Sequence, residues 1–281
     1  MPKIKYINSF SFLYYIIFHG EYMLKNYFAG IDVGTSYIKV VIIDENNKIT
    51  GTFTERTGSN LKNSLTTAFK MAISKVNISD NDIEHITATG FGRNNVSFAN
   101  SAITEIKAHA KGAYFYFPKK INVIDIGGQD TKIIKIDKNG KTIGFKMNRK
   151  CAAGTGSFLE EISYKLNIPL DKMNKLADKS SKETALSSFC TVFASTEILT
   201  RIKEGEKTED MIKSAFESVV RRVIEMDTLT GTIVITGGVV KYNDIILKIL
   251  GKYLGNEIYT TPYPQLNGAI GAALIAKDAK D

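Results

Sequence analysis

The sequence predicts an α/β fold of two related domains that face each other across a cleft. Two observations support this prediction. A strand-like segment near residue 30 recurs near residue 123, with glycine, aspartate and lysine at the same spacing. Each copy is then followed by segments with apolar residues at helical spacing, and such a combination of strands and helices is typical of α/β proteins. The 281 residues are enough for one large domain or two small ones.

The internal repeat has an offset of 93 residues and needs no gaps. Ile31-Asp32 matches Ile124-Asp125, and Gly34 matches Gly127. Repeats of this kind mark duplicated structural units, so we expect the two segments to fold alike. The other identical pairs are Lys39 and Lys132, Ile43-Asp44 and Ile136-Asp137, Asn46 and Asn139, Lys48 and Lys141, and Gly51 and Gly144.

Each copy of the repeat is typical of three antiparallel strands. An apolar run ends in Asp-x-Gly and a tight glycine turn follows. A β-branched run then returns, and a polar turn leads to a third strand. The expected strands are residues 28–32, 37–43 and 49–53 in the first copy, and 121–125, 131–136 and 142–147 in the second.

Apolar residues at helical spacing follow each copy of the repeat. A buried strand is expected at residues 232–235, directly before Gly237 and Gly238. Ser157 and Glu160 have the spacing of a capping box, so a helix is expected to begin there. The expected helices are residues 61–76, 158–166, 192–202, 211–226, 245–254 and 268–276.

The composition is that of a globular protein, with 43% hydrophobic and 23% charged residues. The net charge of +8 comes from scattered lysines and arginines, which are typical of a solvated surface. No basic stripe interleaved with aromatic residues favours nucleic-acid binding, so we expect none. Two cysteines are too few for a disulfide scaffold, and we therefore expect reduced thiols and a cytoplasmic protein.

Residues 1–23 are expected to be a dispensable or disordered extension. Their apolar run, from Phe10 to Phe18, is shorter than the roughly 20 residues that span a bilayer. The segment also has no small-residue cleavage site, which argues against a signal peptide, and we expect no membrane association. Translation that begins at Met23 would explain the extension, and a tail packed on the surface is the alternative.

The two glycine turns are suited to holding the phosphates of a nucleotide. A glycine turn exposes backbone N–H groups, because no Cβ blocks the approach of a ligand. The adjacent carboxylates, Asp32 and Asp125, could hold Mg²⁺ through water, since this ion keeps several waters and takes one or two carboxylates. The sequence has no Gly-x-x-x-x-Gly-Lys-Ser/Thr loop, and no Gly-x-Gly-x-x-Gly follows a strand, which excludes the P-loop and Rossmann classes.

Both cysteines lie beside predicted helix N-termini, where the thiolate form is favoured. Cys151 precedes the helix expected from residue 158, and Cys190 precedes the one expected from residue 192. A single cysteine is often a small buried hydrophobe, but two thiols at helix starts also suit a metal cluster. A cluster held by four thiolates needs two from each of two chains, which predicts a homodimer with the site on its two-fold axis.

The phosphate turns resemble motifs of the ATPase superfamily that includes actin, sugar kinases and chaperone ATPases. Asp32-Val-Gly-Thr-Ser-Tyr-Ile-Lys39 is similar to its first phosphate motif, Asp125-Ile-Gly-Gly-Gln-Asp-Thr-Lys132 to its second, and Ile235-Thr-Gly-Gly238 to its adenosine motif. The resemblance implies two ribonuclease-H-like (actin-like ATPase) domains, 24–118 with 266–281 and 119–265, which close on ATP or ADP with Mg²⁺. The nucleotide-binding residues it implies are Asp32, Gly34, Thr35, Ser36, Lys39, Asp125, Gly127, Gly128, Gln129, Gly237 and Gly238.

The cysteine segments resemble a narrower family, the activators of 2-hydroxyacyl-CoA dehydratases, which also includes ATPase subunits of benzoyl-CoA reductases. The resemblance covers about residues 25–276. It implies a [4Fe–4S] cluster held by Cys151 and Cys190 from each subunit of a homodimer. It also implies ATP hydrolysis coupled to one-electron transfer from ferredoxin or flavodoxin to the dehydratase. The motifs that carry it include Asn148-Arg-Lys-Cys-Ala-Ala-Gly-Thr-Gly156, Cys190-Thr-Val-Phe-Ala-x-x-Glu197, Thr89-Gly-Phe-Gly-Arg93 and Thr104-Glu-Ile-x-x-His-Ala-Lys-Gly112.

Three residues are expected to act on the phosphates. Gln129 and Asp130 follow the second glycine turn and could orient the attacking water, although Asp130 could instead cap the turn. Glu105 belongs to one of the family motifs and is expected in the cleft. His109, one helical turn further on, could be an ordinary helix-surface residue. The repeated lysines, Lys39 and Lys132, could each reach a phosphate or simply point outward from a strand.

Two other functions stay open at this point. A small-molecule kinase of the same fold would bind a sugar or an acid in the cleft, although the chain has little spare sequence for such a site. Alternatively, Zn²⁺ in a shared four-cysteine site would make the dimer an ATP-gated interaction module. Within the family, the sequence does not reveal which dehydratase or reductase is activated.

Overall fold

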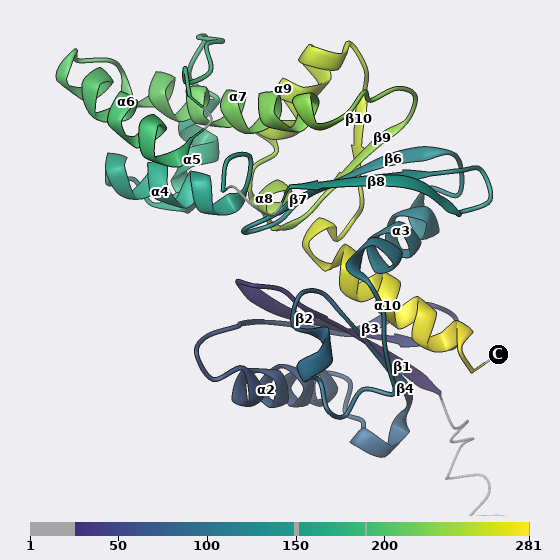
Figure 1. Cartoon of the computed structure of the whole chain (residues 1–281). Helices are drawn as coiled ribbons and strands as arrows, with labels where there is room; N and C mark the ends of the chain where they lie inside the picture. Colours follow the sequence, from purple (N-terminus) through teal and green to yellow (C-terminus); the bar gives the residue numbers. More distant parts are fainter. Residues whose placement is uncertain (1–25, 149–151, 189, 281) are drawn as a thin grey trace, which may run out of the picture.

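The computed structural model describes residues 26–148, 152–188 and 190–280. In these residues the strands form two five-stranded sheets, each surrounded by helices (Figure 1). The first sheet contains β1 (Tyr27–Val33), β2 (Tyr37–Asp44), β3 (Ile49–Arg56), β4 (Ile83–Thr89) and β5 (Ser101–Ala102), in the order β3-β2-β1-β4-β5. The second contains β6 (Ile121–Ile126), β7 (Thr131–Ile136), β8 (Thr142–Asn148), β9 (Ile233–Thr236) and β10 (Ile258–Thr260), in the order β10-β9-β6-β7-β8.

The helices carry the labels of Figure 1. Those in the first part of the chain are α2 (Leu61–Ser74) and α3 (Glu105–Tyr116). Those that follow β8 are α4 (Gly156–Leu166), α5 (Leu170–Ala177), α6 (Thr191–Lys203), α7 (Thr208–Met226), α8 (Gly238–Tyr242), α9 (Ile245–Leu254) and α10 (Asn267–Asp278). Short 3₁₀ turns occupy Asp80–Asp82, Arg93–Asn95 and Pro264–Leu266.

The repeat in the sequence is a repeat of hairpins in the structure. β1 pairs antiparallel with β2, and β6 pairs antiparallel with β7. Both turns close in the same way, because the N–H of Gly34 or Gly127 donates to the carbonyl three residues later, at 3.0 and 2.9 Å. The next turns also match, since the carboxylates of Asp44 and Asp137 each accept two backbone N–H bonds at 2.9 Å. The duplicated unit is therefore confirmed.

Each sheet is covered by helices on both faces. On the first sheet, α2 buries Leu65, Phe69 and Ile73, which have the i, i+4 spacing of an amphipathic helix. The opposite face is covered by α10. On the second sheet, α3 packs on one face, and α4, α6, α7 and α9 pack on the other. Each buried side chain of this size stabilises the fold by about 1.5–3 kcal/mol.

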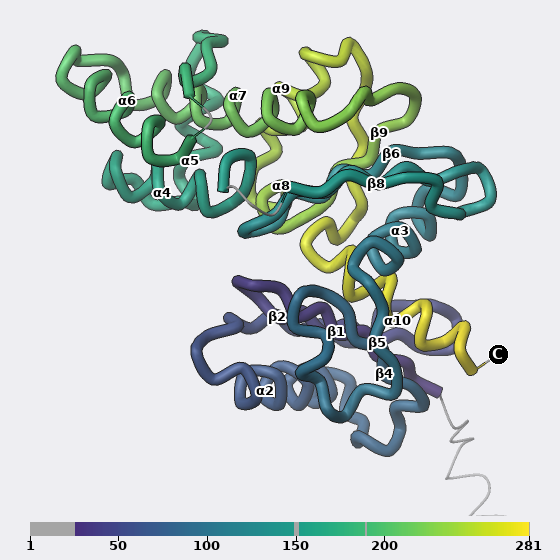
Figure 2. The backbone as a smooth tube through the Cα atoms, viewed as in Figure 1, coloured from purple at the N-terminus to yellow at the C-terminus, as the bar shows by residue number. Residues whose placement is uncertain are grey.

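The helices α3 and α10 pack against each other at the level where the two sheets meet (Figure 2). Glycines set this close approach. A Cβ at Gly30 of β1 would overlap the carbonyl of Ala269 in α10, and a Cβ at Gly271 would overlap that of Ala108 in α3. Because these neighbours are backbone atoms, a larger residue would push α10 away from the sheet.

The predicted helices and strands are confirmed, with shifts of a few residues at their ends. The prediction missed β4 and the short helix α5. The expected capping box is wrong: α4 begins at Gly156 after Thr155, and the Ser157 hydroxyl donates to the carbonyl of Gly128 at 2.7 Å. The expected extension, residues 1–23, lies outside the described residues. No helix in the described ranges is long and apolar enough to cross a membrane.

Candidate functional site

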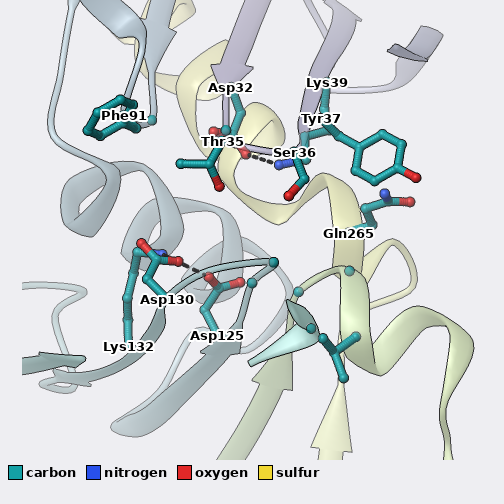
Figure 3. A pocket seen from close by; sticks show the side chains of 18 of the residues that line it. Asp32, Thr35, Ser36, Tyr37, Lys39, Phe91, Asp125, Asp130, Lys132 and Gln265 are labelled. Carbon is teal, nitrogen blue, oxygen red and sulfur yellow. Dashed lines mark hydrogen bonds and ion pairs between the residues drawn. The ribbon is translucent and has the colours of Figure 1, made fainter. Parts of the chain in front are cut away.

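A cleft between the two sheets contains the ends of both repeated hairpins (Figure 3). The turns come so close that a Cβ on Gly128 would lie 2.5 Å from the Ser36 hydroxyl. The cavity measures about 1070 Å³ with its open mouth, which is the size range of small-molecule sites. The predicted residues that line it are Asp32, Gly34, Thr35, Ser36, Lys39, Glu105, Asp125, Gly127, Gly128, Asp130, Gly237 and Gly238.

A lysine and an aspartate form a cross-strand pair in each hairpin. Asp32 lies opposite Lys39, and Asp125 lies opposite Lys132. Opposite residues in an antiparallel pair project to the same face, so each lysine meets its carboxylate, at 3.0 Å in the first pair and 3.2 Å in the second. The idea that the two lysines point outward is wrong, because both line the cleft.

Lys132 is the centre of a buried cluster of charges. Its ammonium group lies 2.8 Å from Asp130 and 3.3 Å from Glu105, in addition to Asp125. Burial of the amine opposes its charge, but the three carboxylates outweigh burial and raise the pKa of Lys132. The side chain of Asp130 is thus held toward the cleft by this lysine, whereas Gln129 is exposed and lies outside the cavity lining.

His109 is buried beneath the two hairpins and is not a helix-surface residue. Its Nδ1 atom lies 3.4 Å from Asp125, and the amide of Asn267 in α10 donates to its backbone carbonyl at 3.0 Å. α10 packs over this side of α3 and removes it from solvent. Burial opposes ionisation of Asp125, but His109, Lys132 and Lys39 outweigh it and lower the pKa of Asp125 to about 2. Asp125 is therefore a carboxylate at neutral pH.

The diglycine after β9 closes the far side of the cleft. Gly237 has φ of +107°, and a Cβ there would overlap the backbone of Ile126. Its N–H donates to the carbonyl of Pro264 at 2.9 Å. Tyr242 and Asn243, which the sequence did not single out, line the cavity beside it. Their proximity in the chain to the diglycine was the available signal.

The second phosphate turn is hydrogen-bonded directly to the start of α4. The N–H groups of Gly156 and Ser157 donate to the carbonyls of Gly127 and Gly128, at 2.9 and 2.8 Å. The serine hydroxyl adds a third bond to Gly128 at 2.7 Å. A displacement of this turn therefore pulls on the N-terminus of α4, which begins five residues after Cys151.

The predicted cluster cysteines can be placed in part. Cys190 is the N-cap of α6, as predicted, and is exposed with a free thiol. Cys151 lies outside the described residues. Within the described ranges, no group of three or more His, Cys, Asp or Glu side chains is arranged to hold a metal ion. α4 and α6 pack against each other, and Ser195 donates to Glu161 at 3.2 Å.

The comparison with protein families agrees with this geometry. A model of the BadF/BadG/BcrA/BcrD ATPase family matches residues 29–276, which include both hairpins, the diglycine and both cysteines. The chain belongs to this ATPase family.

Several characterised relatives of this ATPase are similar over nearly their whole length. The activator of lactoyl-CoA dehydratase from Anaerotignum propionicum is 38% identical, over 90% of this chain and 98% of the relative. The crystal structure of (R)-2-hydroxyglutaryl-CoA dehydratase component A from Acidaminococcus fermentans is 36% identical, with a TM-score of 0.86 over 90% of this chain and 98% of its own. The activator of 2-hydroxyisocaproyl-CoA dehydratase from Clostridium difficile, solved with ADPNP, is 34% identical, with a TM-score of 0.84 over 90% and 95%.

More distant structures confirm the fold class. A ROK family glucokinase from Streptomyces griseus is 14% identical but has a TM-score of 0.56 over 90% of this chain and 99% of its own. The ATPase therefore has the two-domain, actin-like architecture predicted from the glycine repeats. The structure of the described residues also places the predicted phosphate turns, diglycine and Glu105 in one cleft.

Proposed function

We propose that this ATPase is the activator of a 2-hydroxyacyl-CoA dehydratase, to which it passes single electrons from ferredoxin or flavodoxin. A homodimer would share one [4Fe–4S] cluster, and ATP hydrolysis would drive the transfer, in the cytoplasm. The observation that carries the proposal is the bonding of the second phosphate turn to α4. Through Gly156 and Ser157, a nucleotide-dependent movement reaches the helix that follows Cys151.

For ATP hydrolysis, we assign the phosphates to the two glycine turns and the adenosine to Gly237 and Gly238. Asp32 and Asp125 would hold Mg²⁺ through water, since each is a carboxylate in the cleft with a lysine beside it. Asp130, with Gln129 beside it, would orient the water that attacks the γ-phosphate, and Glu105 would face the same water. Lys132 holds two of these carboxylates in place.

The residues near Cys190 are suited to an anionic metal cluster. The thiol is exposed at the N-cap of α6, where the partial positive charge of the helix favours a thiolate. Cys151 would supply the second thiolate from the segment before α4. Two such pairs, one from each subunit, make the four thiolates that a [4Fe–4S] cluster needs. When bound, the cluster would accept and release one electron at a time.

An apolar face of α6 supports the homodimer. Val192, Phe193 and Leu199 are exposed to 70%, 66% and 48%, although side chains of this kind are usually buried. Val192 and Leu199 lie two helical turns apart on one face, close to Cys190. Contact between two copies through this face would cover these side chains and bring the two Cys190 thiols to the same axis.

ATP closure would then act on the cysteines through the chain itself. Binding of phosphates draws the hairpin turns together, and the turn that contains Gly127 and Gly128 pulls on α4. Because α4 packs against α6, the change reaches the helices that follow both cysteines. Hydrolysis releases the γ-phosphate contacts and returns the helices to their first position.

The partner is assigned from the relatives. Three of them are named as activators of dehydratases for lactoyl-CoA, 2-hydroxyisocaproyl-CoA and (R)-2-hydroxyglutaryl-CoA. One of the subunits of benzoyl-CoA reductase from Thauera aromatica is 28% identical, which keeps an ATPase subunit of such a reductase as the alternative. We propose domain boundaries of 24–118 with 266–281, and 119–265, so that the cluster residues lie in the second domain.

The proposal is tested by counting iron and sulfide per dimer after purification without oxygen, in the wild type and in Cys151→Ala and Cys190→Ala. We expect about four irons per dimer, lost in either variant. ATPase activity without iron after attempted reconstitution would contradict the electron-transfer function, and zinc in the same preparation would favour the interaction module.

A further inference from the structure

The glutamate in the Cys-Thr-Val-Phe-Ala-x-x-Glu motif is used by no step described so far. Glu197 lies in α6, seven residues after Cys190, and does not line the nucleotide cleft. Its side chain is 18% exposed. The Oε2 atom accepts both donors of Ser187, the backbone N–H at 2.8 Å and the hydroxyl at 2.5 Å. One carboxylate oxygen thus holds the chain three residues before Cys190.

The other oxygen of Glu197 is held from behind. Arg201, one turn further along α6, donates to Oε1 at 2.6 Å. The same guanidinium donates to Ser214 of α7 at 3.2 Å and lies 3.6 Å from Glu206. Glu197 therefore cannot change rotamer without breaking an ion pair that is fixed to a second helix.

The segment that this carboxylate holds has no regular structure of its own. Among its described residues, the chain between α5 and α6 forms no helix or strand from Ser180 to Ser188. Side chains of α7 hold its earlier part, since Ser180 donates to Asp210 at 2.6 Å and Leu186 donates to Ser218 at 2.9 Å. The contact of Ser187 with Glu197 is the last of these before the chain turns into α6.

Burial and hydrogen bonding both bear on the charge of this carboxylate. Burial opposes ionisation of Glu197, but the bonds from Ser187 and Arg201 outweigh it and lower its pKa. Glu197 is consequently an anion that accepts charge-assisted hydrogen bonds, which are stronger than bonds between neutral groups.

We infer that Glu197 is a positioning residue for Cys190. Its carboxylate ties Ser187 back along α6, so that the chain reverses at a fixed point and the thiol stays at the N-cap. The tie between Ser187, Glu197 and Arg201 is independent of any bound group. Its purpose, to hold a cluster ligand, rests on the proposed function.

The tie itself is tested in the metal-free protein by hydrogen exchange. In Glu197→Ala, and more weakly in Ser187→Ala, we expect exchange of the amides of residues 186–190 to accelerate about tenfold or more, because two strong bonds are lost. Glu204→Ala is the matched control, since Glu204 is an exposed glutamate at the end of the same helix. Unchanged exchange in the folded Glu197→Ala protein would overturn the inference, and Glu197→Gln, which keeps an acceptor for Ser187, is available if the alanine variant does not fold.

Positioning of the thiol is tested by a second readout. In the iron-loaded protein, we expect a chelator to remove iron about 10–100 times faster from Glu197→Ala than from the wild type or the control, with ADP affinity unchanged. Equal rates would overturn the inference even if the segment exchanges faster.

If the wild type binds no iron, the proposed function fails but the positioning claim can still be decided. Cys190 is then alkylated as the single thiol in a Cys151→Ala background. A changed alkylation rate in Glu197→Ala, but not in the control, supports the inference, and an unchanged rate overturns it.

Discussion

Replacing Lys132 with methionine should be strongly destabilising, because the substitution leaves three carboxylates around an uncharged side chain. The lysine side chain is 3% exposed and lies within 3.3 Å of Asp125, Asp130 and Glu105. Removing one partner of a buried ion pair typically costs about 3–5 kcal/mol, since the remaining charge is left without compensation. We expect a loss in this range for Lys132→Met, measured as the free energy of unfolding in urea at pH 7.

A matched control lies on the same strand. Lys135 forms an ion pair with Asp227 at 2.8 Å, but its side chain is 33% exposed. Pairs at exposed positions contribute about 0–1 kcal/mol, so Lys135→Met should have little effect. The destabilisation of Lys132→Met should also shrink at low pH, where the carboxylates become protonated. A loss below about 1 kcal/mol for Lys132→Met would refute the view that this lysine compensates the buried charges.

Three further predictions concern the cleft, the interface and the acid response. Gly237→Ala should weaken ADP binding at least about tenfold in calorimetry, because its Cβ meets the backbone of Ile126; Gly231→Ala, also at positive φ but in open space, should not. Phe193→Glu should shift the homodimer to monomers in analytical ultracentrifugation, and a persistent dimer would place the interface elsewhere. The Asp125 carboxyl, whose pKa is lowered from 3.8 to about 2, contributes about 2 kcal/mol of stability above pH 4, and this is lost as the pH falls through 2. Urea unfolding between pH 2 and 5 should show this loss, and Asp125→Asn should reduce it.

The hairpins and the phosphate turns could be predicted because their determinants are local. The glycine, aspartate and lysine of each copy lie within eight residues of each other, and the cross-strand register brings them together. The diglycine was also predictable, because a glycine pair after a buried strand indicates close approach of a ligand or of another backbone.

His109 and Ser157 could not be placed correctly, because contacts distant in sequence decide their surroundings. His109 is buried by α10, whose first residue, Asn267, follows it by 158 positions. Ser157 has the spacing of a capping residue, but its hydroxyl is captured by the carbonyl of Gly128, 29 residues earlier. The lysines of the hairpins were open to two interpretations from strand alternation alone, since the alternation does not say which face meets the cleft.

The most direct test of the account is whether the nucleotide in the cleft changes the exposure of the cysteine site. Iron removal by a chelator should be measured in the anaerobic protein with ADP and with a non-hydrolysable ATP analogue, in the wild type and in Ser157→Ala, which loses the hydroxyl bond to Gly128. The account predicts that the two nucleotides give different rates in the wild type and that Ser157→Ala reduces the difference. Equal rates with both nucleotides in the wild type would contradict the coupling of the phosphate turn to the cysteines.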